Sequence, residues 1–149
     1  MQVREIMTTP PVTCTPETSI GVAAGRMAES NCGILPVVDA RGTLAGIITD
    51  RDICLAVSRT NRNAVSIAVR EVMTRKVLYV HPEHDVRRVL AAMRTARVRR
   101  VPVLDEAGHV TGLLSLDDVV VRGVPRGDIA AREIVETLHA MYARRPRAA

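Results

Sequence analysis

Two stretches of the chain carry a residue pattern that could bind a sugar diol. They are Gly46-Ile-Ile-Thr49-Asp-Arg-Asp52 and Gly112-Leu-Leu-Ser115-Leu-Asp-Asp118. In each stretch a hydroxyl residue is followed three residues later by an aspartate, where a strand is expected to pass into a helix. A hydroxyl at a helix N-terminus and a carboxylate one turn further along can bind vicinal ribose hydroxyls. The unpaired N–H groups of the same helix end favour a phosphate.

The same spacing also fits a purely structural role. A hydroxyl residue followed three residues later by an acid is the pattern of a helix capping box, which favours Glu or Gln at the second place. Asp is one methylene shorter, so Asp52 and Asp118 are expected to be too short to reach back to the cap. The spacing alone leaves both interpretations open.

These two stretches end the two copies of an internal repeat. A shift of 66 residues superposes the chain on itself without a gap, so that Arg4 coincides with Arg70. Other identical pairs under this shift are Glu5 with Glu71, Met7 with Met73, Thr8 with Thr74, Pro16 with Pro82, Pro36 with Pro102, Gly46 with Gly112 and Asp52 with Asp118. Two copies of one unit predict a pseudo-two-fold body with paired clefts where the copies meet.

Hydrophobic periodicity predicts the same element order in both copies. The first copy is expected to contain a β-prone segment at Val12–Thr15, a helix capped by Thr18 or Ser19, strands at Ile34–Val38 and Leu44–Ile48, and a helix at Asp50–Ser58. The second copy is expected to contain strands at Leu78–Val80, Val101–Leu104 and Val110–Leu114, with helices at Val86–Ala96 and Asp117–Arg122.

A further helix is predicted after the Gly/Pro break at 123–127. Asp128 can cap it, and its apolar residues fall largely on one side, which must be buried against the chain's own core or a second subunit. These residues are Ile129, Ile134, Val135, Leu138, Met141 and Tyr142. The predicted fold class is therefore α/β (α+β), with repeats at 4–60 and 70–123 and a C-terminal helix at 128–143.

Composition narrows the function classes. The chain has two Tyr, no Phe and no Trp, so the aromatic platforms that stack single-stranded nucleic acid are nearly absent. The net charge is +5, with the excess arginines in the second copy and in the tail at Arg144, Arg145 and Arg147. No apolar run is long enough for a membrane span and no signal peptide is evident, so a cytoplasmic protein is expected. Cys14, Cys32 and Cys54 coincide with valines in the second copy and are expected to be buried apolar thiols.

Features found in both copies resemble a tandem cystathionine-β-synthase (CBS) domain pair, or Bateman module. They are the Met-Thr entry at Met7-Thr8 and Met73-Thr74, the Pro-Val strands at Pro36-Val37 and Pro102-Val103, and the Gly-to-Asp endings given above. The resemblance covers about Arg4 to Arg122. It implies a β-α-β-β-α fold for each repeat, with the sheets of both repeats packed together and two clefts at their junction. It also implies an adenosine-containing regulatory ligand, such as AMP, ADP, ATP, S-adenosylmethionine or NAD, and no catalysis.

The resemblance also assigns residues to the clefts. Thr49 with Asp52, and Ser115 with Asp118, match the family's ribose-binding pair, and each cleft takes further residues from the opposite repeat. The first cleft is expected to contain Arg51 together with Tyr79, Arg99, Arg100, Val101 and Pro102. The second is expected to contain Thr13, Gly33, Ile34, Leu35 and Pro36. Only the first cleft is faced by arginines, so it is expected to prefer phosphorylated ligands and to leave less charged ones to the second.

Several alternatives remain at this stage. The alternative for Arg99 and Arg100, less favoured given their position, is a solvated strand edge. The chain could be a ligand-free structural or protein-interaction module, or, less favoured, a nucleic-acid binder. The pair His81 and His84 is weak evidence for zinc, and no catalytic motif is found, so neither a metal nor an enzyme is predicted. Expected partners are an adenine nucleotide, a second copy of the chain in a homodimer and an effector protein.

Overall fold

The computed structural model describes residues 1–143 of the 149-residue chain. The basic tail predicted from Arg144, Arg145 and Arg147 lies outside these residues. The chain divides into two compact units that differ from the two contiguous repeats. Unit 1 contains Met1–Thr8, Leu78–Val103 and the described chain from Leu113, and unit 2 contains Thr9–Val77 and Leu104–Gly112. The first eight residues therefore pack with most of the second repeat.

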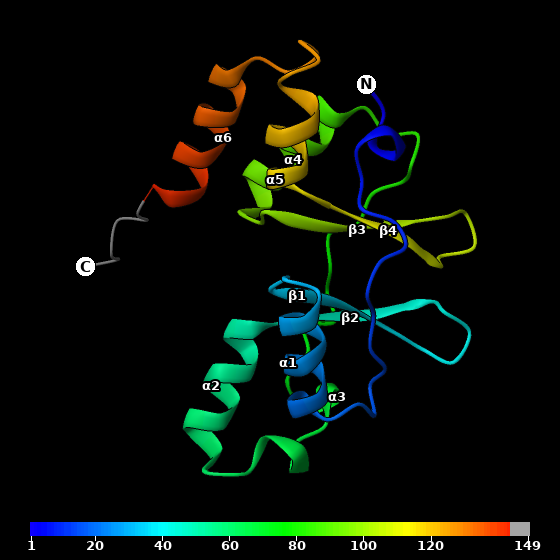
Figure 1. The fold of residues 1–149 in the computed structure, drawn as a ribbon, viewed down its shortest axis with the longest axis vertical. Coiled ribbons are helices and arrows are strands. Elements are labelled where there is room, and N and C mark those ends of the chain that lie inside the picture. Colours follow the sequence, from blue (N-terminus) through cyan, green and yellow to red (C-terminus); the bar gives the residue numbers. More distant parts are fainter. Residues whose placement is uncertain (144–149) are drawn as a thin grey trace. The chain divides into compact units, whose positions relative to one another are not determined.

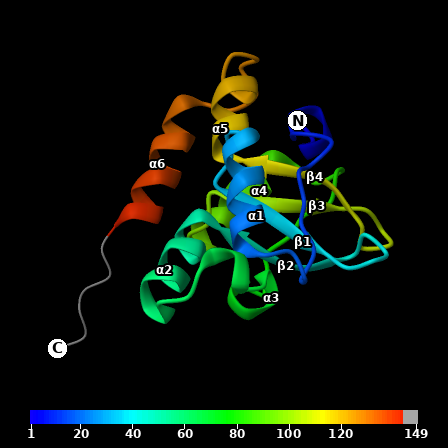
Figure 2. The same cartoon turned by 60° about the horizontal axis from the view of Figure 1, so that its bottom comes forward.

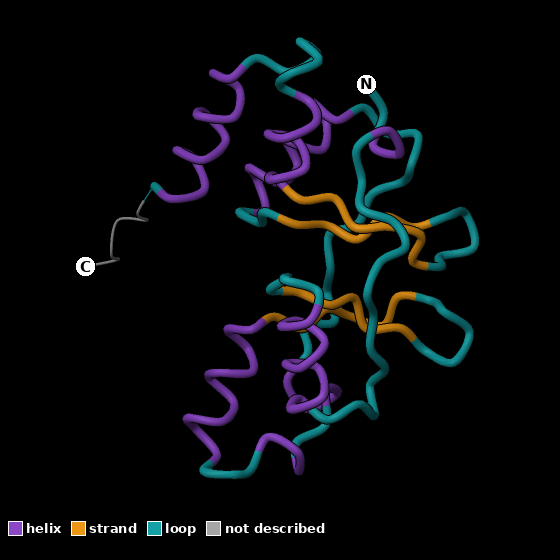
Figure 3. The backbone as a smooth tube through the Cα atoms, viewed as in Figure 1, coloured by secondary structure: helices purple, strands orange, loops and turns teal. Residues whose placement is uncertain are grey.

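Unit 2 is built on a hairpin with helices on it (Figure 1). Strands β1 (Ile34–Val38) and β2 (Leu44–Thr49) lie side by side among the orange strands of Figure 3. They pair antiparallel, with Ile34 opposite Thr49. The helical elements are α1 (Ile20–Glu29), α2 (Asp50–Thr60), η2 (Ala64–Ser66) and α3 (Val69–Val72). The apolar faces of these elements form one core, which contains Ile20, Leu35, Val37, Ile48 and Ile67. A Cβ at Gly46 would lie 2.7 Å from the carbonyl oxygen of Thr74, so this close approach of β2 to the segment after α3 requires glycine.

Unit 1 has the same plan with an added helix. Its elements are η1 (Val3–Glu5), α4 (Val86–Ala96), β3 (Arg100–Leu104), β4 (Val110–Ser115), α5 (Leu116–Asp118), η3 (Val119–Gly123) and α6 (Ala131–Tyr142). The last residue of β3 and the first three of β4 are assigned to unit 2. The strands β3 and β4 form a second two-stranded sheet. Helix α6 packs beside α4 (Figure 1). Figure 2 shows α6 from a second direction. The core includes Val86, Met93, Val101, Leu114 and Ile134.

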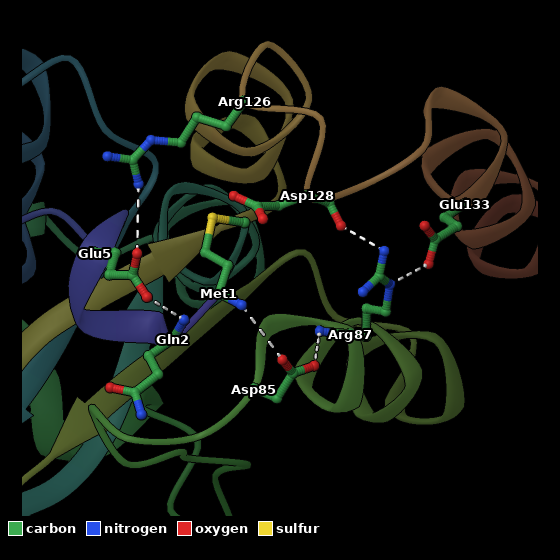
Figure 4. Close-up of polar contacts among 8 residues, drawn as sticks. All are labelled: Met1, Gln2, Glu5, Asp85, Arg87, Arg126, Asp128 and Glu133. Atoms are coloured by element: carbon green, nitrogen blue, oxygen red, sulfur yellow. Dashed lines mark hydrogen bonds and ion pairs between the residues drawn. The ribbon is translucent and has the colours of Figure 1, made fainter.

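The N-terminal segment is tied into unit 1 by polar contacts (Figure 4). The N-terminal ammonium lies 3.6 Å from the Asp85 carboxylate at the start of α4. The Glu5 carboxylate accepts from the Gln2 backbone N–H and lies 3.6 Å from the Arg126 guanidinium. Arg87 of α4 contacts the Glu133 carboxylate at 3.2 Å and so links α4 to α6.

The predicted helices at α1, α2 and α4 and the central strands are confirmed, but the first strand of each repeat is not. Cys14 forms only a single bridge to Val37, and Val80 only a single bridge to Val103. Both bridges are parallel to a strand of the same unit. The proline two residues beyond each bridging residue, Pro16 or Pro82, has no N–H group and cannot extend the ladder.

Two predictions in the C-terminal half were wrong. The helix expected at Asp117–Arg122 is a short α5 followed by a π-helical turn, η3, which contains three consecutive valines that crowd an α-helix. Asp128 does not cap α6. That helix begins at Ala131, and the Glu133 carboxylate accepts from the backbone N–H of Ala130.

The cysteines are less buried than predicted, and the chain's own core covers only part of the apolar stripe of α6. On α6 the side chains of Val135 and Tyr142 are 65% and 62% exposed, whereas Ile134 is buried. Among the cysteines only Cys14 is buried, and Cys54 is exposed on α2. The valines at the matching positions of the second copy therefore indicate that a small apolar residue is accepted there. They do not show that the cysteine is buried.

Candidate functional site

The first motif places Thr49 and Asp52 at the N-terminus of α2. The Thr49 hydroxyl donates to Asp52 Oδ2 at 2.7 Å, and the Thr49 backbone N–H donates to the same oxygen at 2.9 Å. The Asp52 N–H in turn lies 3.2 Å from the Thr49 hydroxyl oxygen. The two side chains are half-buried and fixed against each other at the end of β2.

The second motif has the same local geometry. The Ser115 hydroxyl and backbone N–H donate to Asp118 Oδ2 at 2.5 and 2.9 Å, and the Asp118 N–H lies 3.0 Å from the hydroxyl oxygen. Asp is therefore long enough to complete a capping box, and the expectation that it is too short was wrong. The turn between strand and helix brings the cap N–H towards the third helical residue, so the missing methylene is not needed.

Capping does not use the whole Asp52 carboxylate. Both contacts from Thr49 go to Oδ2, and no residue among 1–143 donates a hydrogen bond to Oδ1. Asp52 has acceptor capacity left for a diol, while the cap holds its orientation. The structural and ligand-binding interpretations are therefore compatible at Asp52.

A surface hollow of ≈ 300 Å³ adjoins Asp52 within unit 2. Its lining residues come from α2 and α3 and comprise Asp52, Leu55, Ala56, Arg59, Thr60, Glu71 and Val72. Arg59 is exposed and stands seven residues after Asp52, which places both on one face of α2. Sequence motifs did not select Arg59, although this helical spacing from Asp52 was a signal that could have identified it.

The arginines predicted for the same cleft lie in unit 1, on and just before β3. Arg99 Nη1 donates to the Tyr142 hydroxyl at 2.8 Å, and its guanidinium carbon is 5.9 Å from the centre of that ring. Arg100 lies 3.6 Å from the carboxylate of Asp117, which is 82% exposed. Neither charge is strongly neutralised, because the phenol is neutral and an exposed ion pair contributes little.

The other predicted residues separate into surface and core positions. Tyr79 is 49% exposed, whereas Val101 and Pro102 of the same unit are buried. Thr13 is half-buried, and its carbonyl oxygen accepts from Arg26 at 2.8 Å. Arg51 is exposed on the first turn of α2, Gly33 is half-buried, and Ile34, Leu35 and Pro36 are buried in β1. The buried side chains support the sheet and leave only backbone groups for a ligand.

Each predicted cleft draws its two halves from different units. Thr49 and Asp52 belong to unit 2, whereas Tyr79, Arg99 and Arg100 belong to unit 1. The reverse holds for Ser115 and Asp118 with their partners. The joining of these halves across the units stays a prediction.

The histidine pair does not form a metal site with other described residues. The His81 and His84 rings pack edge to face with centroids 5.1 Å apart, and Tyr79 packs on His81 in the same way. Among residues 1–143, no three His, Cys, Asp or Glu side chains gather closely enough to hold a metal ion. In the same range, every helix is too short or too polar to span a membrane.

The chain belongs to the CBS domain family. The model of the CBS domain matches it twice, over residues 3–59 and 69–123. The fold described above is thus that of a CBS domain pair.

Relatives of two kinds share this region. The chain is 33% identical to the CBS domain-containing protein YhcV of Bacillus subtilis over 119 residues, which are 80% of this chain and 83% of YhcV. It is also 33% identical over 117 residues to the L-aspartate semialdehyde sulfurtransferase of Methanocaldococcus jannaschii. That match covers 78% of this chain but only 22% of the enzyme.

Solved structures of CBS proteins resemble the chain closely. The CBS domain pair of protein MJ0100, in complex with 5′-methylthioadenosine and S-adenosyl-L-methionine, has a TM-score of 0.76 and 31% identity, covering 85% of this chain and 98% of that one. CBSX2 in complex with AMP has a TM-score of 0.71 and 25% identity, with 85% and 98% covered. Both of those proteins bind adenosine-containing ligands.

Proposed function

We propose that the protein is a regulatory module that binds an adenine nucleotide or adenosyl ligand, with Thr49 and Asp52 as the ribose-binding pair. The observation that carries the proposal is the Asp52 carboxylate, which is fixed through Oδ2 while Oδ1 has no donor among the described residues. Asp52 follows the end of β2 and lines the hollow between α2 and α3. The ligands of the two related structures contain a ribose, whose diol is a suitable donor to such an oxygen.

Charge supplies the second part of the proposal. Arg99 and Arg100 are assigned to the ligand's phosphate, because their present partners are a neutral phenol and an exposed carboxylate. Arg59 adds a positive charge on the face of α2 that carries Asp52. The ligand class favoured by this arrangement is AMP, ADP or ATP. Ser115 and Asp118, with Thr13, Ile34, Leu35 and Pro36, form a weaker second position for less charged ligands such as adenosine or S-adenosylmethionine.

The proposed output is a change in self-association or in an effector protein. Val121, Val135 and Tyr142 expose apolar side chains on η3 and α6, which supports a homodimer through this part of unit 1. The proposal includes no catalytic step and no metal, and it places the protein in the cytoplasm, where adenine nucleotides act as signals.

Calorimetry with Asp52 variants tests the ribose assignment. We expect Asp52→Ala to weaken AMP binding by about 1.5–3 kcal/mol, because a charge-assisted hydrogen bond to the diol is lost. Asp50→Ala is the matched control, since it removes a carboxylate from the same helical turn whose one hydrogen bond among residues 1–143 comes from the Arg51 N–H. Unchanged AMP and ATP affinity in Asp52→Ala would leave Asp52 as a helix cap and favour the ligand-free structural module.

A further inference from the structure

The second aspartate has partners that the first lacks. Asp118 Oδ1 accepts from the Thr8 hydroxyl at 3.2 Å and lies 3.4 Å from the Arg122 guanidinium. Because Ser115 occupies Oδ2, both oxygens of this carboxylate have protein partners within unit 1. Its side chain is 12% exposed. Asp118 therefore has no unengaged oxygen comparable with Oδ1 of Asp52.

The internal repeat provides a control for this difference. Under the 66-residue shift Thr8 corresponds to Thr74, Asp118 to Asp52 and Arg122 to Ala56. The Thr8 backbone N–H donates to the Leu113 carbonyl at 2.9 Å, and Thr74 donates to the Ile47 carbonyl at the same distance. The backbone is thus alike in both places. The two places differ in the residue four positions after the aspartate. Asp118 is followed there by Arg122, and Asp52 by Ala56.

Arg122 is held in place by more than Asp118. Its Nη1 donates to the carbonyl oxygens of Ile6 and Met7 at 2.7 and 3.1 Å. These carbonyls belong to the segment that also carries Thr8. Arg122 therefore fixes both the charge beside Asp118 and the backbone that presents the Thr8 hydroxyl, and a ribose would have to displace a supported network rather than one mobile side chain.

We propose that Arg122, assisted by Thr8, closes the second ribose position and limits the module to one tight ligand per chain. The inference rests on the proposed function, because it assumes that the Ser/Thr–Asp pairs bind ribose. A ribose hydroxyl at Asp118 must replace the hydrogen bond from Thr8 and compete with the Arg122 charge, whereas at Asp52 it meets an oxygen without a donor. Arg122 is then the residue that makes two equivalent motifs unequal.

Calorimetry with adenosine and AMP tests this, starting from a chain whose first position is disabled. We expect Asp52→Ala to bind either ligand weakly, and the double variant Asp52→Ala/Arg122→Ala to bind one ligand per chain about ten- to hundredfold more tightly. Adding Asp118→Ala should remove that gain. Equal affinity with and without Arg122 would overturn the inference.

The matched control is Arg126→Ala in the same Asp52→Ala background. Arg126 also ties the N-terminal segment, through Glu5 at 3.6 Å (Figure 4), but it does not contact Asp118. It should give no gain. Thr8→Val keeps the Arg122 contacts, guards against a misfolded Arg122→Ala chain, and should give a smaller gain in the same direction.

The wild-type stoichiometry separates the two proposals. The proposed function and the closure of the second position by Arg122 together predict one tightly bound ligand per chain. Two equally tight ligands per chain would retain the proposed function and refute the closure by Arg122. An absence of binding by adenosine, AMP, ADP, ATP and S-adenosylmethionine alike would refute the proposed function, and the inference with it.

Discussion

Replacing Arg99, which precedes β3, and Arg100, its first residue, should weaken the binding of a ligand's phosphate and leave the binding of its ribose unchanged. Two unit charges about 4 Å apart interact by roughly 4 kcal/mol at an effective dielectric near 20, before desolvation is subtracted. Arg99 is exposed and the Arg100 side chain is 29% exposed, so solvent screening reduces this value substantially. We therefore expect the preference for AMP over adenosine to amount to about 1–2 kcal/mol, or roughly 5- to 30-fold.

The assay is calorimetry of AMP and adenosine with wild type and with Arg99→Ala/Arg100→Ala. The double variant should lose the preference for AMP and keep its affinity for adenosine. Arg94→Ala/Arg132→Ala is the control, because it removes the same charge from positions on α4 and α6. An equal loss of both ligands in Arg99→Ala/Arg100→Ala would mean that these arginines serve the fold, and the phosphate assignment would have to be abandoned.

Three further outcomes follow from the described contacts. Burial raises the pKa of the Cys14 thiol to about 11, so native protein at pH 8 should react with a thiol reagent at Cys54 and not at Cys14; rapid modification of Cys14 would contradict its burial. Backbone N–H groups of Thr43 and Arg41 lower the pKa of Asp39, so its stabilisation is present above the unfolded pKa near 4 and lost as the pH falls through the lower folded pKa. Asp39→Asn should accordingly unfold more easily than wild type at pH 7 in urea and approach it below pH 4, and a constant difference would refute the linkage. Light scattering should give twice the 16.2 kDa chain mass, and a monomer at tens of micromolar would remove the homodimer.

The regular elements could be predicted because their signals are local. The strand Ile34–Val38 and the helix Val86–Ala96 have the predicted bounds, since each has an uninterrupted apolar pattern with a clear start. The Ser19 cap of α1 is confirmed for the same reason, with its hydroxyl oxygen 3.2 Å from the Val22 N–H. The single bridges at Cys14 and Val80 were less predictable, because β-propensity does not show where a partner strand stops.

The motif was found from sequence, but its environment was not. The contact of Thr8 with Asp118 joins residues 110 positions apart, and nothing in the local pattern of either residue indicates it. The bond between Arg99 and Tyr142 also depends on how α6 packs. Whether the Asp52 carboxylate reaches the Thr49 N–H depends on the backbone conformation of the turn, which the sequence does not give. Spacing therefore located the candidate site, whereas the distribution of free and occupied oxygens required the structure.

The most direct test of the central claim is a crystal structure of the protein grown with AMP. We expect one AMP in which a ribose hydroxyl lies about 2.6–3.2 Å from the Asp52 carboxylate, with Thr49 beside it and the phosphate near the Arg99 and Arg100 guanidinium groups. A structure in which AMP occupies another surface, and Asp52 contacts only Thr49, would contradict the claim.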